Sequence, residues 1–195
     1  MKSVYTVFSV LFILVLIPVI LYAQQDGEMS KEDKIWMEYM TPSSMHQMMA
    51  THVGEWKTIN KFWMQPDAEP VVSEGTAVNE MILGGRYLQS THSGMVMGMP
   101  MNGISIEAYD NAKKVFQNIW IDNMGTGMYR AEGKYDENTK TITYYGTGYD
   151  PVQGKDVKFR ETLEFVESGT HVLKMYMIDD GKEFQNMEIT FTKAD

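Results

Sequence analysis

The residues of this chain best suited to metal chemistry are methionines. Met95, Met97, Met99 and Met101 recur at every second position. An extended chain would place all four thioethers on one side, and thioethers are soft ligands that suit Cu(I) or Ag(I). A second soft cluster contains Met45, His46, Met48 and Met49. The alternative is that residues 94–103 form a mobile apolar lid, because methionine adapts to irregular surfaces.

Arg86 is the strongest candidate for binding a polar group. It follows Gly84 and Gly85, and a strand beginning there would put Arg86, Leu88, Ser90 and His92 on one face. If that face points inward, Arg86 could bind a ligand carboxylate through two parallel hydrogen bonds. The alternative is an internal ion pair, because buried charges are normally paired. Glu161 is its candidate partner, since it lies on the otherwise apolar face from Val157 to Phe165.

Several aromatic residues could line a binding pocket, although ordinary core packing explains them equally well. They are Trp56, Tyr109, Trp120, Tyr129 and Tyr144. An enzyme in this framework would use an internal histidine or glutamate, such as Glu107 or Glu161, as a general base. A haem-binding barrel would need His92 or His171 as axial ligand. The sequence contains no HExxH motif and no GxSxG motif, and it identifies no particular cofactor.

Composition restricts the possible environments and partners. The 195 residues carry a formal charge of −9 and include no cysteine. Residues 1–23 begin with Lys2, continue as an apolar run and end at Ala23, which predicts a signal peptide, with a retained membrane anchor as the alternative. Cleavage would remove one lysine and no acid, giving a charge of −10. We expect a secreted or periplasmic protein that binds neither nucleic acid nor, after signal cleavage, membranes.

The elements that position these residues change character along the chain. Residues 24–42 are polar and predict a flexible N-terminal segment, with one helical turn between Lys31 and Met40. Pro42 then favours a break, and Ser43 and Ser44 can cap a short helix over 44–52. From Trp56 onward the apolar pattern has a period of two and predicts about ten strands separated by turn residues.

An ordered set of short motifs resembles a known family. The set is Gly54-Glu55-Trp56, Gly84-Gly85-Arg86, Tyr109-Asp110, Trp120-Ile121-Asp122, Gly133-Lys134-Tyr135-Asp136 and Asp150-Pro151. In this order the motifs resemble the uncharacterised bacterial domain-of-unknown-function family 1579, over about residues 43–193. The resemblance implies a lipocalin-like, or calycin-like, barrel and implies no catalytic residue.

The sequence therefore predicts an all-β fold over residues 43–195, an antiparallel up-and-down barrel of about ten strands preceded by a short helix. Closure would remove the two exposed edges of a ten-stranded meander. The function we expect is binding of a small apolar or amphipathic molecule in the barrel, with Arg86 at its polar end and residues 94–103 as a gate. The alternatives are Cu(I) or Ag(I) binding and a barrel enzyme. Ligand identity and oligomeric state are left open.

Overall fold

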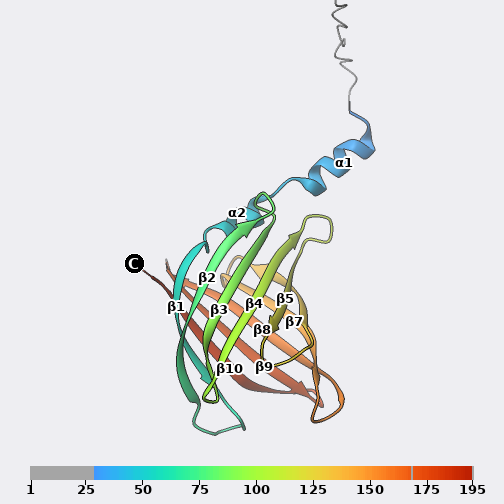
Figure 1. Ribbon diagram of the computed structural model, residues 1–195. Coiled ribbons are helices and arrows are strands. Elements are labelled where there is room, and N and C mark those ends of the chain that lie inside the picture. The colour runs from blue at the N-terminus through green and yellow to red at the C-terminus, as the bar shows by residue number, and fades with distance from the viewer. Residues whose placement is uncertain (1–28, 168, 195) are drawn as a thin grey trace, which may run out of the picture.

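The chain folds into one closed β-barrel with two helices before it (Figure 1). The computed structural model describes residues 29–167 and 169–194. The helices are α1 (Lys31–Met40) and α2 (Ser44–Ala50). The strands are β1 (Gly54–Phe62), β2 (Val71–Ile82), β3 (Tyr87–Val96), β4 (Met99–Asp110), β5 (Val115–Asp122), β6 (Tyr129–Asp136), β7 (Thr141–Asp150), β8 (Lys155–Glu167), β9 (Thr170–Asp179) and β10 (Lys182–Lys193). The predicted signal peptide lies outside the described residues.

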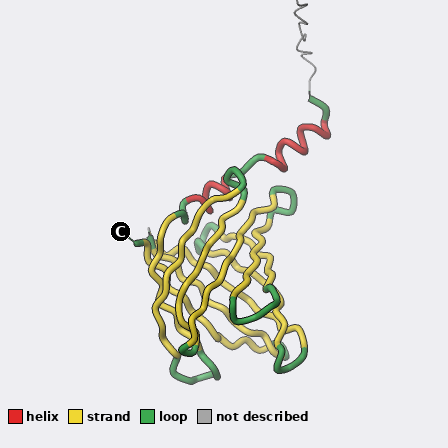
Figure 2. The backbone as a smooth tube through the Cα atoms, viewed as in Figure 1, coloured by secondary structure: helices red, strands yellow, loops and turns green. Residues whose placement is uncertain are grey.

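The barrel closes because the first strand pairs with the last. Each strand is antiparallel to its neighbour in sequence, and β1 also pairs with β10 along Trp56↔Lys193 to Phe62↔Met187. Connections between neighbouring strands are loops at the two ends of the barrel (Figure 2). No strand edge therefore remains unpaired along this register. The predicted all-β, antiparallel up-and-down barrel of ten strands with a preceding short helix is confirmed.

The methionine-rich segment is a tight hairpin, and the prediction of a loose gate over residues 94–103 is wrong. β3 and β4 continue to Val96 and Met99, leaving only Met97 and Gly98 in the turn. Both have positive φ, 50° and 77°, which is the backbone of a type I′ turn. The turn reverses the chain, so Met99 and Met101 share a face with Val96 and Gly94, whereas Met95 lies on the other face. The four thioethers are not on one side.

Helix α2 covers part of one end of the barrel. Its residues His46 and Met49 are buried, and Met49 joins a core cluster that includes Leu88, Phe116 and Tyr144. Ser43 donates its backbone N–H to His46 Nδ1 at 2.9 Å, so His46 completes the start of the helix. The nitrogen that accepts this bond must be unprotonated. Burial accordingly lowers the pKa of His46, and the nearby Arg86 lowers it further.

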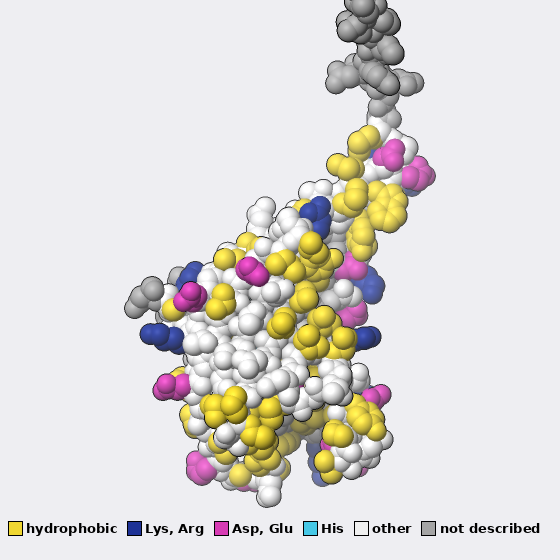
Figure 3. All heavy atoms as spheres, viewed as in Figure 1, with side chains coloured by type: hydrophobic (Ala, Val, Ile, Leu, Met, Phe, Trp, Pro, Cys, Tyr) yellow, Lys and Arg dark blue, Asp and Glu magenta, His cyan; other side chains and the backbone are white. Residues whose placement is uncertain are grey.

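Helix α1 stands away from the barrel, with none of its residues buried (Figures 1 and 3). It spans Lys31–Met40, the residues over which the sequence predicted helical structure within an otherwise flexible segment. Arg86 Nη2 donates to Met40 O at 2.7 Å, and Asn111 Nδ2 donates to Thr41 O at 2.7 Å. Two barrel turns therefore hold the C-terminal end of α1. Among the described residues, no helix has the length and apolarity needed to cross a membrane.

The inward face of the barrel combines glycines with large rings. A Cβ added to any of four glycines would meet the ring of an aromatic residue. The pairs are Gly103 with Trp120, Gly133 with Tyr144, Gly146 with Phe159, and Gly148 with Tyr129. Each ring thus occupies the space beside a glycine of the neighbouring strand, as in the known pairing of aromatic residues with strand glycines. The four rings therefore lie along the inner wall of the barrel.

Candidate functional site

Two carboxyl groups and one phenol meet inside the barrel. Glu107 lies on β4, Tyr144 on β7 and Glu161 on β8. Tyr144 and Glu161 are directly opposite each other in the register of β7 and β8. Tyr144 Oη donates a hydrogen bond of 2.6 Å to Glu107 Oε2. We call Glu107, Tyr144 and Glu161 the acid cluster.

One oxygen of the acid cluster is left without a partner. Glu107 is 6% exposed, and its Oε1 has no hydrogen-bond partner among the described residues. A buried polar atom without a partner costs free energy comparable to a lost hydrogen bond. Such an atom in a folded protein suggests a missing donor, supplied by a water molecule or a ligand.

Burial determines the charge of the acid cluster. It raises the pKa of Glu107 to about 7, although the hydrogen bond from Tyr144 acts in the opposite direction. Burial also raises the pKa of Glu161 to about 7, and the charge of Glu107 contributes in the same sense. The pKa of Tyr144 lies well above its usual value because of burial and then Glu107. Near neutral pH the two carboxyls therefore titrate together, each opposing the ionisation of the other.

Several residues beside the acid cluster are only partly buried. Glu161 itself is only partly covered, although the barrel surrounds it. Met175 and Met177 of β9 occupy inward positions opposite Glu161 and Phe159, and they too remain partly accessible. Asn118 is directly opposite Glu107 in the register of β4 and β5, and it is also only partly buried. The residues beside the acid cluster thus combine apolar side chains with a few polar groups, a composition typical of ligand sites in barrels.

His92 and Trp120 form a second inward group. Their rings meet edge to face at 5.0 Å, and Trp120 Nε1 donates to Asp122 Oδ2 at 2.5 Å. Burial lowers the pKa of His92 to about 4, so the imidazole is neutral near pH 7. Asp122 also accepts from the backbone N–H groups of Met124 and Gly125 through Oδ1, so both of its oxygens have partners, and the two rings supply apolar, neutral surface.

A pocket of about 640 Å³, which we call the end pocket, opens between α2 and the ends of β8, β9 and β10. Its ring-bearing residues are His52, Trp56, Tyr135, Phe165 and His171. Its other lining residues are Met48, Thr51, Gly169, Thr170, Thr192, Lys193 and Ala194. The end pocket contains no carboxylate among these lining residues, in contrast to the acid cluster.

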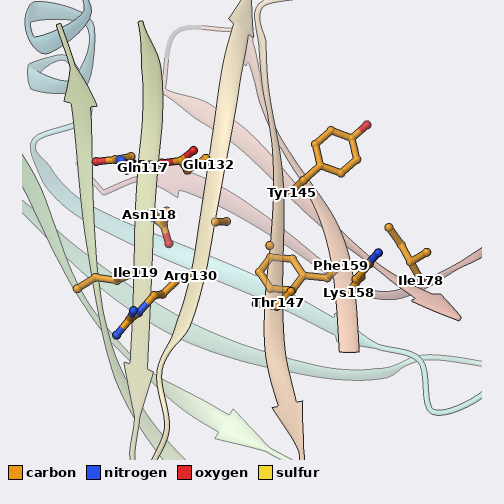
Figure 4. A pocket seen from close by; sticks show the side chains of 12 residues that line it. Gln117, Asn118, Ile119, Arg130, Glu132, Tyr145, Thr147, Lys158, Phe159 and Ile178 are labelled. Carbon is orange, nitrogen blue, oxygen red and sulfur yellow. Dashed lines mark hydrogen bonds between the residues drawn. The ribbon is translucent and has the colours of Figure 1, made fainter. Parts of the chain in front are cut away.

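A hollow of about 630 Å³ lies at the wall formed by β5 to β9 (Figure 4). Ala131 and Gly146 leave the sheet thin there, so residues of both faces border the hollow, including inward Phe159 and outward Lys158. Figure 4 shows the labelled side chains coming from neighbouring strands. Neither buried carboxyl lines this hollow.

The structure brings together some of the predicted site residues. Tyr144 and Glu161 belong to the acid cluster, His92 and Trp120 form the second group, and Trp56 lines the end pocket. The other two lie on the inner wall: Tyr109 packs on Phe116 at 4.9 Å, and Tyr129 lies against Gly148.

Arg86 is the exception, and the prediction that it points into the barrel is wrong. It precedes β3 and donates to Leu83 O, Gly84 O and Met40 O at the surface. The two positive-φ glycines before it place Arg86 in the turn, outside the strand alternation. It neither reaches a ligand in the barrel nor pairs with Glu161.

Glu107 was expected only as an internal acid that could act as a general base. Its burial confirms the internal position, whereas its hydrogen bond with Tyr144 was not predicted. On β4, Gly103, Ser105, Glu107 and Tyr109 alternate with Ile104, Ile106 and Ala108. The usual rule puts the isoleucines inside, whereas Glu107 is buried and Ile104 is exposed. Gly103 and Tyr109 in the polar row could have indicated that this row faces inward, because an interior lined by rings needs small residues beside those rings.

The fold and site define this protein as a lipocalin-like barrel with a polar group buried in an apolar interior. The chain belongs to the family described as protein of unknown function (DUF1579), whose model matches residues 41–193. Among solved structures it is similar to Rv2717c from M. tuberculosis, with 12% identity, a TM-score of 0.59 and coverage of 80% of this chain and 100% of the other. It is also similar to the S-type phycobiliprotein lyase CPES from Guillardia theta, with 10% identity, a TM-score of 0.53 and coverage of 82% and 97%. The search of curated proteins found no match. At these identities the likeness shows the fold alone.

Proposed function

We propose that the barrel binds a small apolar or amphipathic molecule whose hydrogen-bond donor or cationic group meets Glu107 and Glu161. The observation that carries this proposal is the buried, unpartnered Oε1 of Glu107. A ligand N–H or O–H directed at that atom would remove the cost of leaving it unpaired. The partly accessible methionines Met175 and Met177 supply adaptable apolar surface for the remainder of the ligand.

The charge of the interior decides between ligand classes. Arg86 is outside the barrel, and Glu107, Glu161 and Asp122 all occupy inward positions. A ligand carboxylate would therefore meet acids instead of a guanidinium. An amine or a hydroxyl is favoured over a carboxylate, which reverses the expectation based on Arg86.

We also propose that the protein works outside the cytoplasm. The leader-like sequence of residues 1–23 supports this location. The similarity to a phycobiliprotein lyase supports the barrel framework, and no substrate follows from it.

Three probes with the same eight-carbon chain test the proposal: octylamine, octanol and octanoate. Isothermal titration calorimetry at pH 8 is expected to rank their affinities octylamine first, octanol second and octanoate last. Octylamine stays protonated at pH 6, whereas the carboxyls gain protons, so its affinity should fall at that pH. Glu161→Gln should weaken octylamine binding by about tenfold, equivalent to about 1.4 kcal/mol.

The matched control is Glu164→Gln on the same strand, since Glu164 is exposed. It removes the same charge from the protein without touching the interior, and octylamine affinity should not change. Equal or tighter binding of octanoate, or equal losses in both variants, would refute the proposed ligand class.

A further inference from the structure

The end pocket gathers three side chains that are good ligands for a soft metal ion. Met48 lies in the last turn of α2, and His52 follows four residues later. The chain continues to turn there, because His52 N–H donates to Met49 O at 3.0 Å. Met48 and His52 both line the end pocket. His171, at the start of β9, lines the same pocket.

We propose that the end pocket binds one Cu(I) ion through the thioether of Met48 and the imidazoles of His52 and His171. This site is separate from the acid cluster and does not depend on the proposed function. It also differs from the methionine row of residues 95–101, whose thioethers the β3–β4 hairpin distributes over two faces.

The two imidazoles are in contact. Their ring centroids are 4.6 Å apart, at an interplanar angle of 58°. Both ring nitrogens of His171 are buried and make no well-formed hydrogen bond among the described residues, although the backbone of Thr170 lies near the ring. Buried imidazoles normally donate or accept at least one hydrogen bond. A metal ion would use a nitrogen that the protein leaves unpaired.

The remaining lining of the end pocket disfavours hard divalent ions. It contains no carboxylate, and the positive charge of Lys193 opposes a divalent ion more strongly than a singly charged one. Within the described residues, no group of three His, Asp or Glu side chains could hold a metal ion. Hard divalent ions prefer oxygen ligands, whereas a thioether with two imidazoles suits Cu(I). Trp56 and Phe165 pack around His171 at 4.5 and 5.1 Å and restrict its position.

Competition for Cu(I) against bicinchoninate, with ascorbate as reductant, tests the site on the chain lacking residues 1–23. We expect one Cu(I) per chain. Met48→Leu should weaken binding at least tenfold, and His171→Phe, which keeps a ring in the packing, should abolish it. The control is Met45→Leu, because Met45 lies on the same helix and packs against the core without lining the pocket. Its affinity should equal that of the unaltered protein.

Ag(I) titration provides a second readout that does not depend on copper redox chemistry. In spectra of ¹³C-methyl methionine, the Met48 signal should shift and the Met45 signal should not. If His171→Phe fails to fold, the comparison of Met48→Leu with Met45→Leu decides. Absence of Cu(I) binding would overturn the proposal, as would binding that survives Met48→Leu or that is lost only when Met95, Met97, Met99 and Met101 are replaced by leucine.

Discussion

Replacing Glu161 by glutamine should stabilise the protein in a pH-dependent way. Burial and Glu107 raise the pKa of Glu161 from 4.5 to about 7. The folded chain therefore holds a proton between these values that the unfolded chain releases. Stability contributed by this group is highest below pH 4.5 and is lost as the pH rises toward 7. Glutamine has no proton to lose and avoids that loss.

The size of the effect follows from the displacement of the pKa. A rise from 4.5 to about 7 corresponds to about 3 kcal/mol for a fully buried group, at about 1.4 kcal/mol per pKa unit. Because Glu161 is partly accessible and shares its titration with Glu107, we expect about 2 kcal/mol. The gain of Glu161→Gln over the unaltered protein should therefore grow by about 2 kcal/mol from pH 5 to pH 8.

Urea denaturation at pH 5 and pH 8 measures this difference, with unchanged m-values as the check for two-state unfolding. Comparing the variant with the unaltered protein at each pH cancels the contribution of the histidines to stability, which has the opposite pH dependence. The lowered pKa values of His52 and His92 make the whole protein less stable as the pH falls below 6.5. A gain that stays constant with pH, or that grows toward pH 5, would refute the burial of an ionisable Glu161. Glu164→Gln, on the outer face, should show no such growth.

Three further substitutions test other parts of the account. Tyr144→Phe removes the 2.6 Å hydrogen bond to Glu107, so it should cost about 1–3 kcal/mol of stability and raise the Glu107 pKa in a ¹³C-carboxyl NMR titration; a lowered pKa would contradict this. Gly133→Ala should destabilise the barrel in thermal melts, because its Cβ would lie 2.7 Å from the Tyr144 ring, whereas Gly125→Ala has open space and should be neutral. Arg86→Ala should speed amide exchange in α1 and leave the barrel strands protected; unchanged α1 exchange would show that Asn111 suffices.

The barrel was predictable from local patterns. Turn residues such as Asp180-Gly181, both with positive φ, mark where the chain reverses, and each short connection requires an antiparallel neighbour. Closure followed because a ten-stranded meander would otherwise leave two edges. The Met97-Gly98 turn was missed because methionine rarely adopts positive φ. Only pairing between β3 and β4 overrides that preference.

The site was predictable only in part. Glu161 was identifiable because an acid interrupts the apolar row from Val157 to Phe165. On β4, by contrast, the polar row is the inward one, and alternation alone cannot say which face is inside. Arg86 lies at the surface, where it donates to Met40 O at the end of α1. This contact joins segments far apart in the sequence, so no local pattern predicts it.

The most direct test of the central claim is a titration of octylamine at pH 8, followed through the side-chain carboxyl ¹³C signals of the glutamates. If the ligand's polar group meets the acid cluster, the signals of Glu107 and Glu161 should shift together and saturate, while that of exposed Glu164 stays in place. Shifts confined to glutamates on the outer surface, with Glu107 and Glu161 unchanged, would contradict ligand binding inside the barrel.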